Sequence, residues 1–164
     1  MSRITVIELF KENMHFPAGH FTIFSATERE CLHGHNFSVY VALTARLGSN
    51  GMAFDYDIYK DRIRLLCKEI SHTFLLPADS PYLRIEDKQN YYHVHFHDEM
   101  IPFLKRDVTI LPLRNITVEE LAFWFVERLT EKSDQLAEHQ IMAVTAKVFS
   151  GPGQCGSANW EKDV

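Results

Sequence analysis

The sequence HNFSVYVALTA, residues 35–45, alternates apolar and polar side chains along its length. An alternation with a period of two is typical of a β-strand that buries one face. Four apolar residues share that face: Phe37, Val39, Val41 and Leu43. If no β-bulge intervenes, the same count points the side chains of His33 and His35 to the buried side.

The stretch before this strand has a similar alternation. Six apolar residues share one parity with His20: Ile4, Val6, Phe10, Met14, Phe16 and Ala18. We therefore expect residues 4–20 to be strand-like, with His20 on the apolar side. Near the end of the chain, residues 142–148 alternate again, and a short final strand is expected at residues 158–160.

Two segments between these strands have the spacing of amphipathic helices. The first follows Asp55 and Asp57, either of which can cap it, and one face carries Tyr59, Ile63, Leu66 and Ile70. The second begins at Thr117, which forms a capping box with Glu120, and its apolar stripe is Val118, Leu121, Ala122, Phe125 and Leu129.

Prolines interrupt residues 75–114, so we expect an irregular insertion at about residues 77–110, with Tyr91–Phe96 as a short strand. The remaining order is strand, strand, helix, helix, strand, strand. This order predicts a single α+β domain over residues 1–164, with both helices on one face of the sheet.

The composition excludes several classes of protein. Hydrophobic residues make up 46% of the 164 residues and charged residues 24%, which excludes an intrinsically disordered chain. The formal net charge is −5 without blocks of like charge, so neither nucleic acid nor a membrane is an expected partner. No apolar run is long enough for a membrane span or a signal peptide, so we expect a cytoplasmic protein. Three scattered cysteines form no disulfide framework.

Three histidines are candidate metal ligands. His33 and His35 point to one face of a strand, and His20 can join them if its strand pairs with theirs. Three imidazoles that leave one position open are typical of catalytic zinc, because structural zinc usually has four protein ligands. The alternative is that His33 and His35 are surface residues beside a turn glycine.

Four motifs make the chain similar to a known family. They are Phe16-Pro-Ala-Gly-His20, Leu32-His33-Gly-His35-Asn36-Phe37, Phe54-Asp55-Tyr56 with Lys60, and Thr117-Val-Glu119-Glu-Leu-Ala122. With these motifs the chain resembles the 6-pyruvoyltetrahydropterin synthase and 6-carboxytetrahydropterin synthase family. The resemblance implies a T-fold, which is a four-stranded antiparallel sheet with two helices on one face. It also implies a zinc ion on His20, His33 and His35.

The resemblance also implies catalytic residues. Family members usually carry a catalytic Cys upstream of the His-Gly-His motif and an Asp-His pair after the first helix. Glu30 lies three residues before His33, as in the subgroup in which Glu replaces that Cys, so Glu30 is the expected base, with a pKa raised by partial burial. Cys31 is the alternative, because on an unbroken strand it would face the metal. His72 fits the proton relay, although Ser71 replaces its Asp.

The substrate-binding residues depart from the family. Its members hold the pterin with a Glu-Thr pair on the penultimate strand, but residues 146–154 contain no acid. A modified or different heterocycle is therefore an open alternative. Gln154 can offer a neutral donor and acceptor in place of the acid. Thr117 and Glu119 are further candidate substrate-binding residues, because they match the family motif.

A second histidine pattern, His93, His95 and His97, could hold another metal. We favour instead an exposed or interface strand in which Val94 and Phe96 point to the core.

The expected function is a zinc-dependent carbon–oxygen or carbon–carbon lyase that acts on dihydroneopterin triphosphate or a related bicyclic substrate. The resemblance places it in tetrahydrobiopterin, folate or deazapurine pathways such as queuosine biosynthesis. The alternatives are a zinc-dependent hydrolase or hydratase on a non-pterin substrate, and a T-fold binding module that has lost catalysis. The T-fold also implies a homo-oligomer, a hexamer of two stacked trimers that closes sheets into barrels between subunits.

Overall fold

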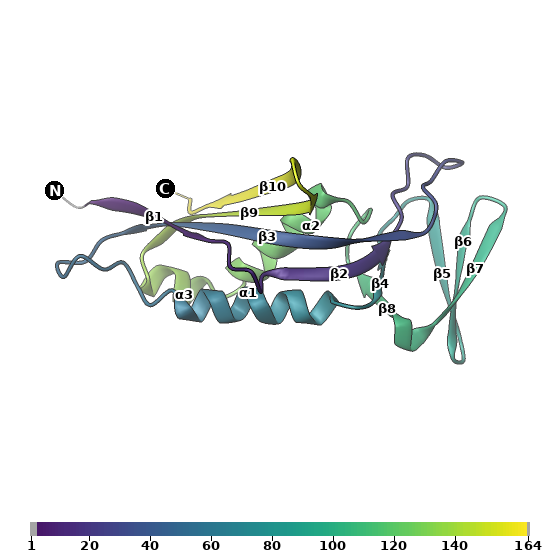
Figure 1. Ribbon diagram of the computed structural model, residues 1–164, viewed down its shortest axis with the longest axis horizontal. Helices are drawn as coiled ribbons and strands as arrows, with labels where there is room; N and C mark the ends of the chain where they lie inside the picture. The colour runs from purple at the N-terminus through teal and green to yellow at the C-terminus, as the bar shows by residue number, and fades with distance from the viewer. Residues whose placement is uncertain (1–2, 164) are drawn as a thin grey trace.

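The computed structural model describes residues 3–163, which form two β-sheets and three α-helices (Figure 1). In chain order the elements are β1 (Ile4–Leu9), β2 (His15–His20), β3 (His33–Arg46), α1 (Asp57–Ile70), β4 (Phe74–Pro77), β5 (Leu83–Lys88), β6 (Tyr91–Phe96), β7 (Glu99–Leu104), the 3-10 helix η1 (Lys105–Asp107), β8 (Val108–Leu111), α2 (Val118–Thr130), α3 (Ser133–Glu138), β9 (Ile141–Gly151) and β10 (Gln154–Glu161).

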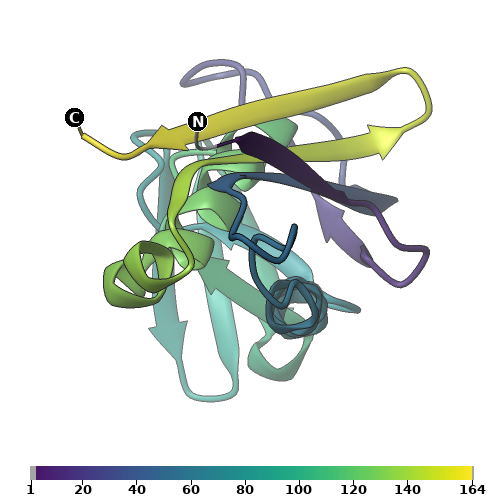
Figure 2. The ribbon, with the colours of Figure 1, turned by 90° about the vertical axis from the view of Figure 1, so that its left-hand side faces the viewer.

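The main sheet is built around β3. Its strand order is β10-β9-β3-β2-β4-β8, and β1 also pairs with β3. The 14 residues of β3 pair first with β2 and then with β1 along one edge, while β9 pairs along the other. The strands β1, β2, β3, β9 and β10 are antiparallel, and β4 and β8 extend the sheet by parallel pairing. The helices lie on one face of this sheet (Figure 2), which confirms the expected α+β arrangement.

The N-terminal strand differs from the expectation, because a turn at residues 10–14 divides it into β1 and β2. Ile4 was expected in the core but is 57% exposed, whereas Leu9, of the opposite parity, is buried. A shift of one residue at the turn moves the apolar face to the other side of the strand. Only β2, which ends at His20, keeps the expected orientation.

The main core lies between the sheet and the helices. Phe16 of β2 stacks on Phe37 of β3 with ring centroids 5.0 Å apart, and Phe125 of α2 lies 5.9 Å from Phe16. The expected apolar faces of α1 and α2 are packed into this core. Within residues 3–163, no helix is long and apolar enough to cross a membrane.

The two long helices begin in different ways. Thr117 caps α2 as expected, because its hydroxyl oxygen accepts a hydrogen bond from the N–H of Glu120. Neither expected aspartate caps α1, whose N-cap is Tyr56 without a side-chain hydrogen bond. Asp55 instead accepts a hydrogen bond from the N–H of Asp57, at 3.0 Å.

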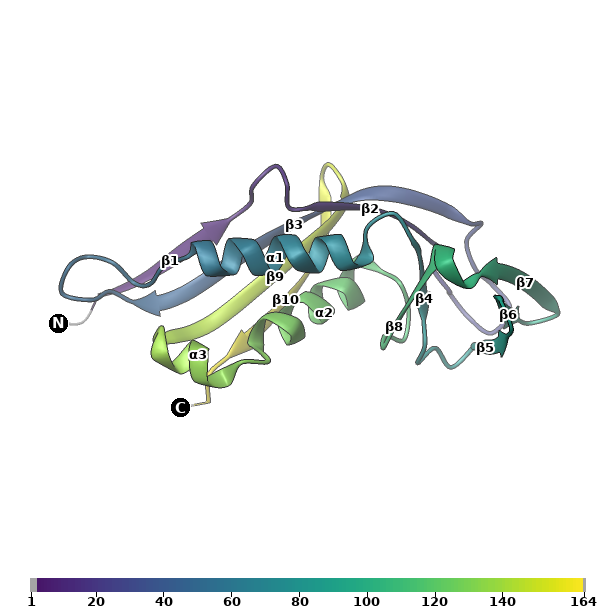
Figure 3. The ribbon, with the colours of Figure 1, turned by 90° about the horizontal axis from the view of Figure 1, so that it is seen from below.

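A small antiparallel sheet, β5-β6-β7, occupies most of the segment that was expected to be irregular. It lies at one end of the molecule, beyond β4 and β8 (Figure 3). Its hairpin turns contain Gln89 and His97 at φ +50° and +51°, a conformation that sequence rules assign mainly to Gly and Asn. Pro102 is compatible with β7 because β7 is an edge strand. Only β6 was predicted, and its bounds are confirmed.

The small sheet has a core of its own, which includes residues just after β2. Val94 and Phe96 of β6 pack in one cluster with Phe21 and Ile23. We call residues 21–32, between β2 and β3, the site loop. The small sheet therefore packs directly against the site loop, which carries Glu30.

Candidate metal centre and active site

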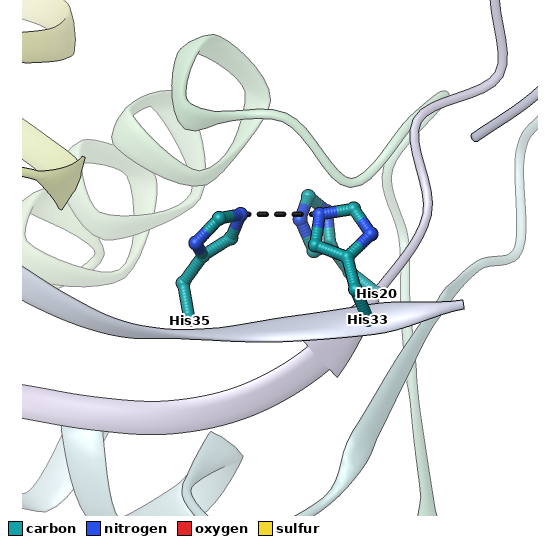
Figure 4. Close-up of side chains that lie close together, drawn as sticks. All are labelled: His20, His33 and His35. Atoms are coloured by element: carbon teal, nitrogen blue, oxygen red, sulfur yellow. Dashed lines mark hydrogen bonds between the residues drawn. The ribbon is translucent and has the colours of Figure 1, made fainter. Parts of the chain in front are cut away.

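Two paired strands bring three histidines together at one end of the main sheet (Figure 4). His20 on β2 is opposite His33 on β3, and His35 follows two residues later on the same face. The ring centroid of His20 lies 4.6 Å from that of His33 and 5.2 Å from that of His35. One ligand atom of each lies within 4.8 Å of the others, and no other group of three such residues occurs within residues 3–163. The expected convergence of these histidines is confirmed.

The hydrogen bonds of this cluster fix the tautomers of two of its rings. His20 Nδ1 lies 2.8 Å from the carbonyl oxygen of Ile116, and His33 Nδ1 lies 2.8 Å from that of Cys31. A carbonyl oxygen only accepts, so each Nδ1 carries a proton and each neutral ring keeps an Nε2 lone pair. His20 Nε2 is buried without a partner, and His33 Nε2 lies 3.1 Å from His35 Nε2. A bound cation would satisfy these atoms, and carbonyls that orient ligating rings are usual around zinc.

The protonation of His20 also fits a ligand. Burial is the main cause that lowers the pKa of His20, and the hydrogen bond to Ile116 opposes it. The charges of His33 and His35 add to the lowering. His20 is therefore neutral at pH 7, which is the form that binds a metal.

Glu30 lies beside the cluster. Its Oε2 is 3.7 Å from His33 Nε2 and accepts a hydrogen bond from the Thr22 N–H at 2.9 Å. Burial acts to raise the pKa of Glu30, but the hydrogen bonds from Thr22 and the charges of His33 and His20 outweigh it and lower the pKa. The expectation of a raised pKa is therefore wrong, because the sequence does not reveal the N–H of Thr22. Glu30 is an ionised carboxylate at neutral pH.

Cys31 is adjacent to Glu30 but is not part of the histidine group. The strand β3 begins only at His33, so the parity of a strand does not extend to Cys31. Its side chain is exposed, and its carbonyl oxygen contacts His33 Nδ1. Cys31 and Glu30 line the same cavity of about 500 Å³.

His72 follows α1 at φ +61°, and its N–H donates to the carbonyl of Pro17 at 2.7 Å. It lines a second cavity, of about 550 Å³, with His33 and His35 but not with Glu30. Across residues 3–163, no hydrogen bond or ring contact joins His72 to Glu30. The structure thus places His72 beside the histidine cluster, and its role in a proton relay stays a prediction.

The three candidate substrate-binding residues occupy two places. Thr117 and Glu119 line a cavity of about 430 Å³ at the start of α2, together with Tyr82. Gln154 is the first residue of β10, and its Nε2 donates to Ser150 Oγ at 3.0 Å. The structure thus brings Thr117 and Glu119 together and places Gln154 apart from their cavity.

The second histidine pattern lies on the small sheet. Val94 and Phe96 are 0% and 2% exposed, as expected for a strand in which both point to the core. His97 belongs to a turn rather than to β6. Within the described part of the chain, these histidines join no group of three possible ligands.

Some contributions to the site had no signal in the sequence. The N–H of Thr22 and the carbonyl of Ile116 are backbone groups, which no motif identifies. The side chain of Asn115 bonds both the N–H and the carbonyl of Ile23, which fastens the start of α2 to the site loop. Such contacts depend on the tertiary fold rather than on local spacing.

The chain is similar to known pterin synthases. Residues 8–158 match the model of the family described as 6-pyruvoyl tetrahydropterin synthase. A candidate 6-carboxy-5,6,7,8-tetrahydropterin synthase of Methanocaldococcus jannaschii is 29% identical over 126 residues, which cover 75% of this chain and 76% of that protein. The crystal structure of Plasmodium vivax 6-pyruvoyl tetrahydropterin synthase has a TM-score of 0.92 at 26% identity and covers 98% of this chain and 99% of that one.

The corresponding Plasmodium falciparum structure has the same TM-score, 0.92, at 24% identity, covers 97% of this chain and 99% of that chain, and supports the fold alone. These similarities confirm the T-fold that the motifs implied, although the main sheet has seven strands rather than the expected four and includes the parallel strands β4 and β8. They extend through the small sheet as well as the histidine cluster. The chain belongs to the 6-pyruvoyl tetrahydropterin synthase family.

Proposed function

We propose that this protein is a zinc-dependent lyase that acts on dihydroneopterin triphosphate or a related bicyclic substrate. The observation that carries the proposal is the cluster of three imidazoles beside an ionised carboxylate, with Glu30 Oε2 3.7 Å from His33 Nε2. Three neutral imidazoles with one open position are typical of catalytic zinc. Zinc bound there would act as a Lewis acid on an oxygen of the substrate side chain.

Glu30 is the proposed general base, which accepts a carbon-bound proton from the side chain of the substrate. The Thr22 N–H holds Oε2 in place, and the lowered pKa keeps the carboxylate ionised. Two Plasmodium vivax structures, each 25% identical to this chain, are described as catalytic-residue mutants in which a glutamate is replaced by alanine or by cysteine. They support a catalytic glutamate in this fold. Cys31 stays the second candidate for the base.

We propose that Glu119 takes over the role of the acid that β9 lacks. Glu119 is exposed in the first turn of α2 and shares a cavity with Thr117. Ile116, which directly precedes Thr117, accepts the hydrogen bond from His20, so the start of α2 is tied to the histidine cluster. A carboxylate there can accept hydrogen bonds from the guanidine-like edge of a pterin. Gln154 is proposed as a neutral contact.

We also propose that the chain forms a homo-oligomer, a hexamer of two trimers. The strand β10 is an edge of the main sheet, and the face of that sheet opposite the helices is uncovered (Figure 1). Exposed edges favour pairing with another copy. The relay role of His72 is proposed only across such an interface. Light scattering that shows a 19.1 kDa monomer would contradict both proposals.

Product analysis tests the proposed reaction. Protein with a verified zinc content is incubated with dihydroneopterin triphosphate, and the products are identified by mass spectrometry. We expect a product that has lost its triphosphate by elimination, without taking up water, or that has a shortened side chain, and no turnover after removal of the zinc by a chelator. A hydrated or hydrolysed product with an intact carbon skeleton would identify the hydrolase alternative, and unchanged substrate would identify a binding module.

A further inference from the structure

Arg29 connects the site loop with the small sheet, and all three nitrogens of its guanidinium group donate hydrogen bonds. Nε and Nη2 both donate to Oε2 of Glu99 on β7, at 2.9 and 2.6 Å. Nη1 donates to the backbone carbonyl oxygen of Glu30 at 2.8 Å. The guanidinium carbon lies 5.2 Å from the ring centroid of Phe21 and 5.8 Å from that of Phe96. The Arg29 side chain is only 17% exposed, so this is not a solvated surface ion pair.

These contacts reach the residues that define the candidate base. Phe21 directly follows the candidate ligand His20, and Glu30 is bonded to Arg29 by its own carbonyl. The N–H of Glu30 donates to the carbonyl of Thr22 at 2.9 Å, and the N–H of Thr22 donates back to the Glu30 carboxylate. The backbone of Glu30 is therefore held from both sides, by Thr22 and by Arg29, and Arg29 is in turn bonded to Glu99 of the small sheet.

The two elements also share a cavity. Arg29 and Glu30 of the site loop, and Phe96 and Glu99 of the small sheet, line one cavity of about 500 Å³. A movement of the small sheet would therefore displace one wall of this space and the backbone of Glu30 together.

We propose that Arg29 is a positioning residue, which ties Glu30 to β6 and β7 and thereby holds the Glu30 carboxylate against the histidine cluster. The small sheet is then a support for the catalytic loop rather than a passive insertion. The kinetic consequence rests on the proposed lyase function, but the structural consequence does not. Arginine is required because its three nitrogens, spread over one planar group, reach Glu99 and the Glu30 carbonyl in different directions, whereas the donors of lysine all sit on one nitrogen.

The test compares Arg29→Lys and Glu99→Gln with a matched control, Glu86→Gln. Glu86 also forms an ion pair on the small sheet, at 2.8 Å from Arg84, but it has no contact with Arg29 or Glu30 among the described residues. Glu99 has a half-exposed side chain (49%), so its substitution should not prevent folding even if Arg29→Lys does. Each variant is assayed for zinc content, for kcat and KM with dihydroneopterin triphosphate, and for hydrogen exchange of the peptide covering residues 21–32.

For Arg29→Lys we expect kcat to fall about 10- to 100-fold, because a small misplacement of a reacting group can cost about that much, while KM and zinc content stay within about twofold. Glu99→Gln should show a smaller fall in kcat, and exchange in residues 21–32 should be faster in both. The double variant should lose no more than Arg29→Lys alone, because both changes remove one connection. Glu86→Gln should match the wild type in all readouts.

Two outcomes separate this proposal from the proposed function. If the wild type turns over the substrate but both Arg29→Lys and Glu99→Gln keep its kcat and its exchange rates, Arg29 does not position Glu30 and the proposal is overturned. If neither the wild type nor any variant has activity, but hydrogen exchange in residues 21–32 is faster in Arg29→Lys and Glu99→Gln than in the wild type, the positioning is supported and the lyase function is contradicted. A loss of zinc equal to the loss of kcat would show that Arg29 supports the ligands instead, which also overturns the proposal.

Discussion

Two strands of this molecule carry a His-x-His sequence in different surroundings: His33-Gly-His35 on β3 and His93-Val-His95 on β6. On β3, the neighbouring strand places His20 opposite His33, and three rings converge. On β6, the residues opposite His93 are Glu86 and Pro102, and those opposite His95 are Arg84 and Met100.

The difference shows that the pattern itself does not make a metal site. His95 Nε2 lies 4.0 Å from a Glu86 oxygen, but Glu86 already binds Arg84 and Lys88. The β3 pair gains a third imidazole from β2, and backbone carbonyls fix the tautomers of His20 and His33. A metal site thus depends on the partner strand and on the groups that orient the rings.

Substitution of one histidine in each His-x-His pair by alanine should give the largest difference in activity. We expect His33→Ala to abolish turnover of dihydroneopterin triphosphate, because it removes a ligand and its lone pair from the cluster. The matched variant His93→Ala should keep the activity of the wild type. A steady-state assay of both measures the contrast, and equal activities would remove the functional distinction between the strands.

The next largest difference in activity is expected between variants of two neighbouring residues of the site loop, Glu30 and Cys31. Glu30→Gln should lower kcat by about 100- to 10,000-fold, as expected for a lost general base, because the amide keeps the shape but does not accept the proton. Cys31→Ser should keep most of the activity, since its thiol lies outside the histidine group. Single-turnover kinetics with equal zinc content measures both. Equal losses would assign a direct role to Cys31.

The smallest effects are expected for the residue between the two histidines of each pair, which is Gly34 on β3 and Val94 on β6. Substitution by alanine should destabilise the protein at both positions, by overcrowding at Gly34 and by a cavity at Val94. A Cβ on Gly34 would lie 2.8 Å from the carbonyl oxygen of Ala18, so Gly34→Ala must push β3 away from β2. We expect a loss of about 1–3 kcal/mol in the free energy of unfolding, with weaker zinc binding. Val94 is fully buried, so Val94→Ala should cost about 2 kcal/mol through a cavity, without changing zinc binding. Chemical denaturation and zinc titration separate the two, and unchanged zinc affinity in Gly34→Ala would contradict the strand geometry.

The sequence was sufficient to predict the structure where the periodicity of the apolar residues agrees with the observed packing. The alternation of β3 and the apolar faces of α1 and α2 predicted the core, and the parity of His20, His33 and His35 predicted their convergence. It failed where a turn shifts the count, as between β1 and β2, and where left-handed turns lack glycine, as at Gln89 and His97. The pKa of Glu30 could not be predicted because it depends on the backbone of Thr22, and the role of Arg29 depends on contact with a sheet about 70 residues away.

Zinc content tests the central claim most directly. Metal analysis of the purified wild type, His35→Ala and His95→Ala compares the two His-x-His strands in one measurement that needs no substrate. The account predicts about one zinc per chain in the wild type and in His95→Ala, and far less than one in His35→Ala. An unchanged zinc content in His35→Ala, or a loss of zinc in His95→Ala, would contradict the metal centre at His20, His33 and His35.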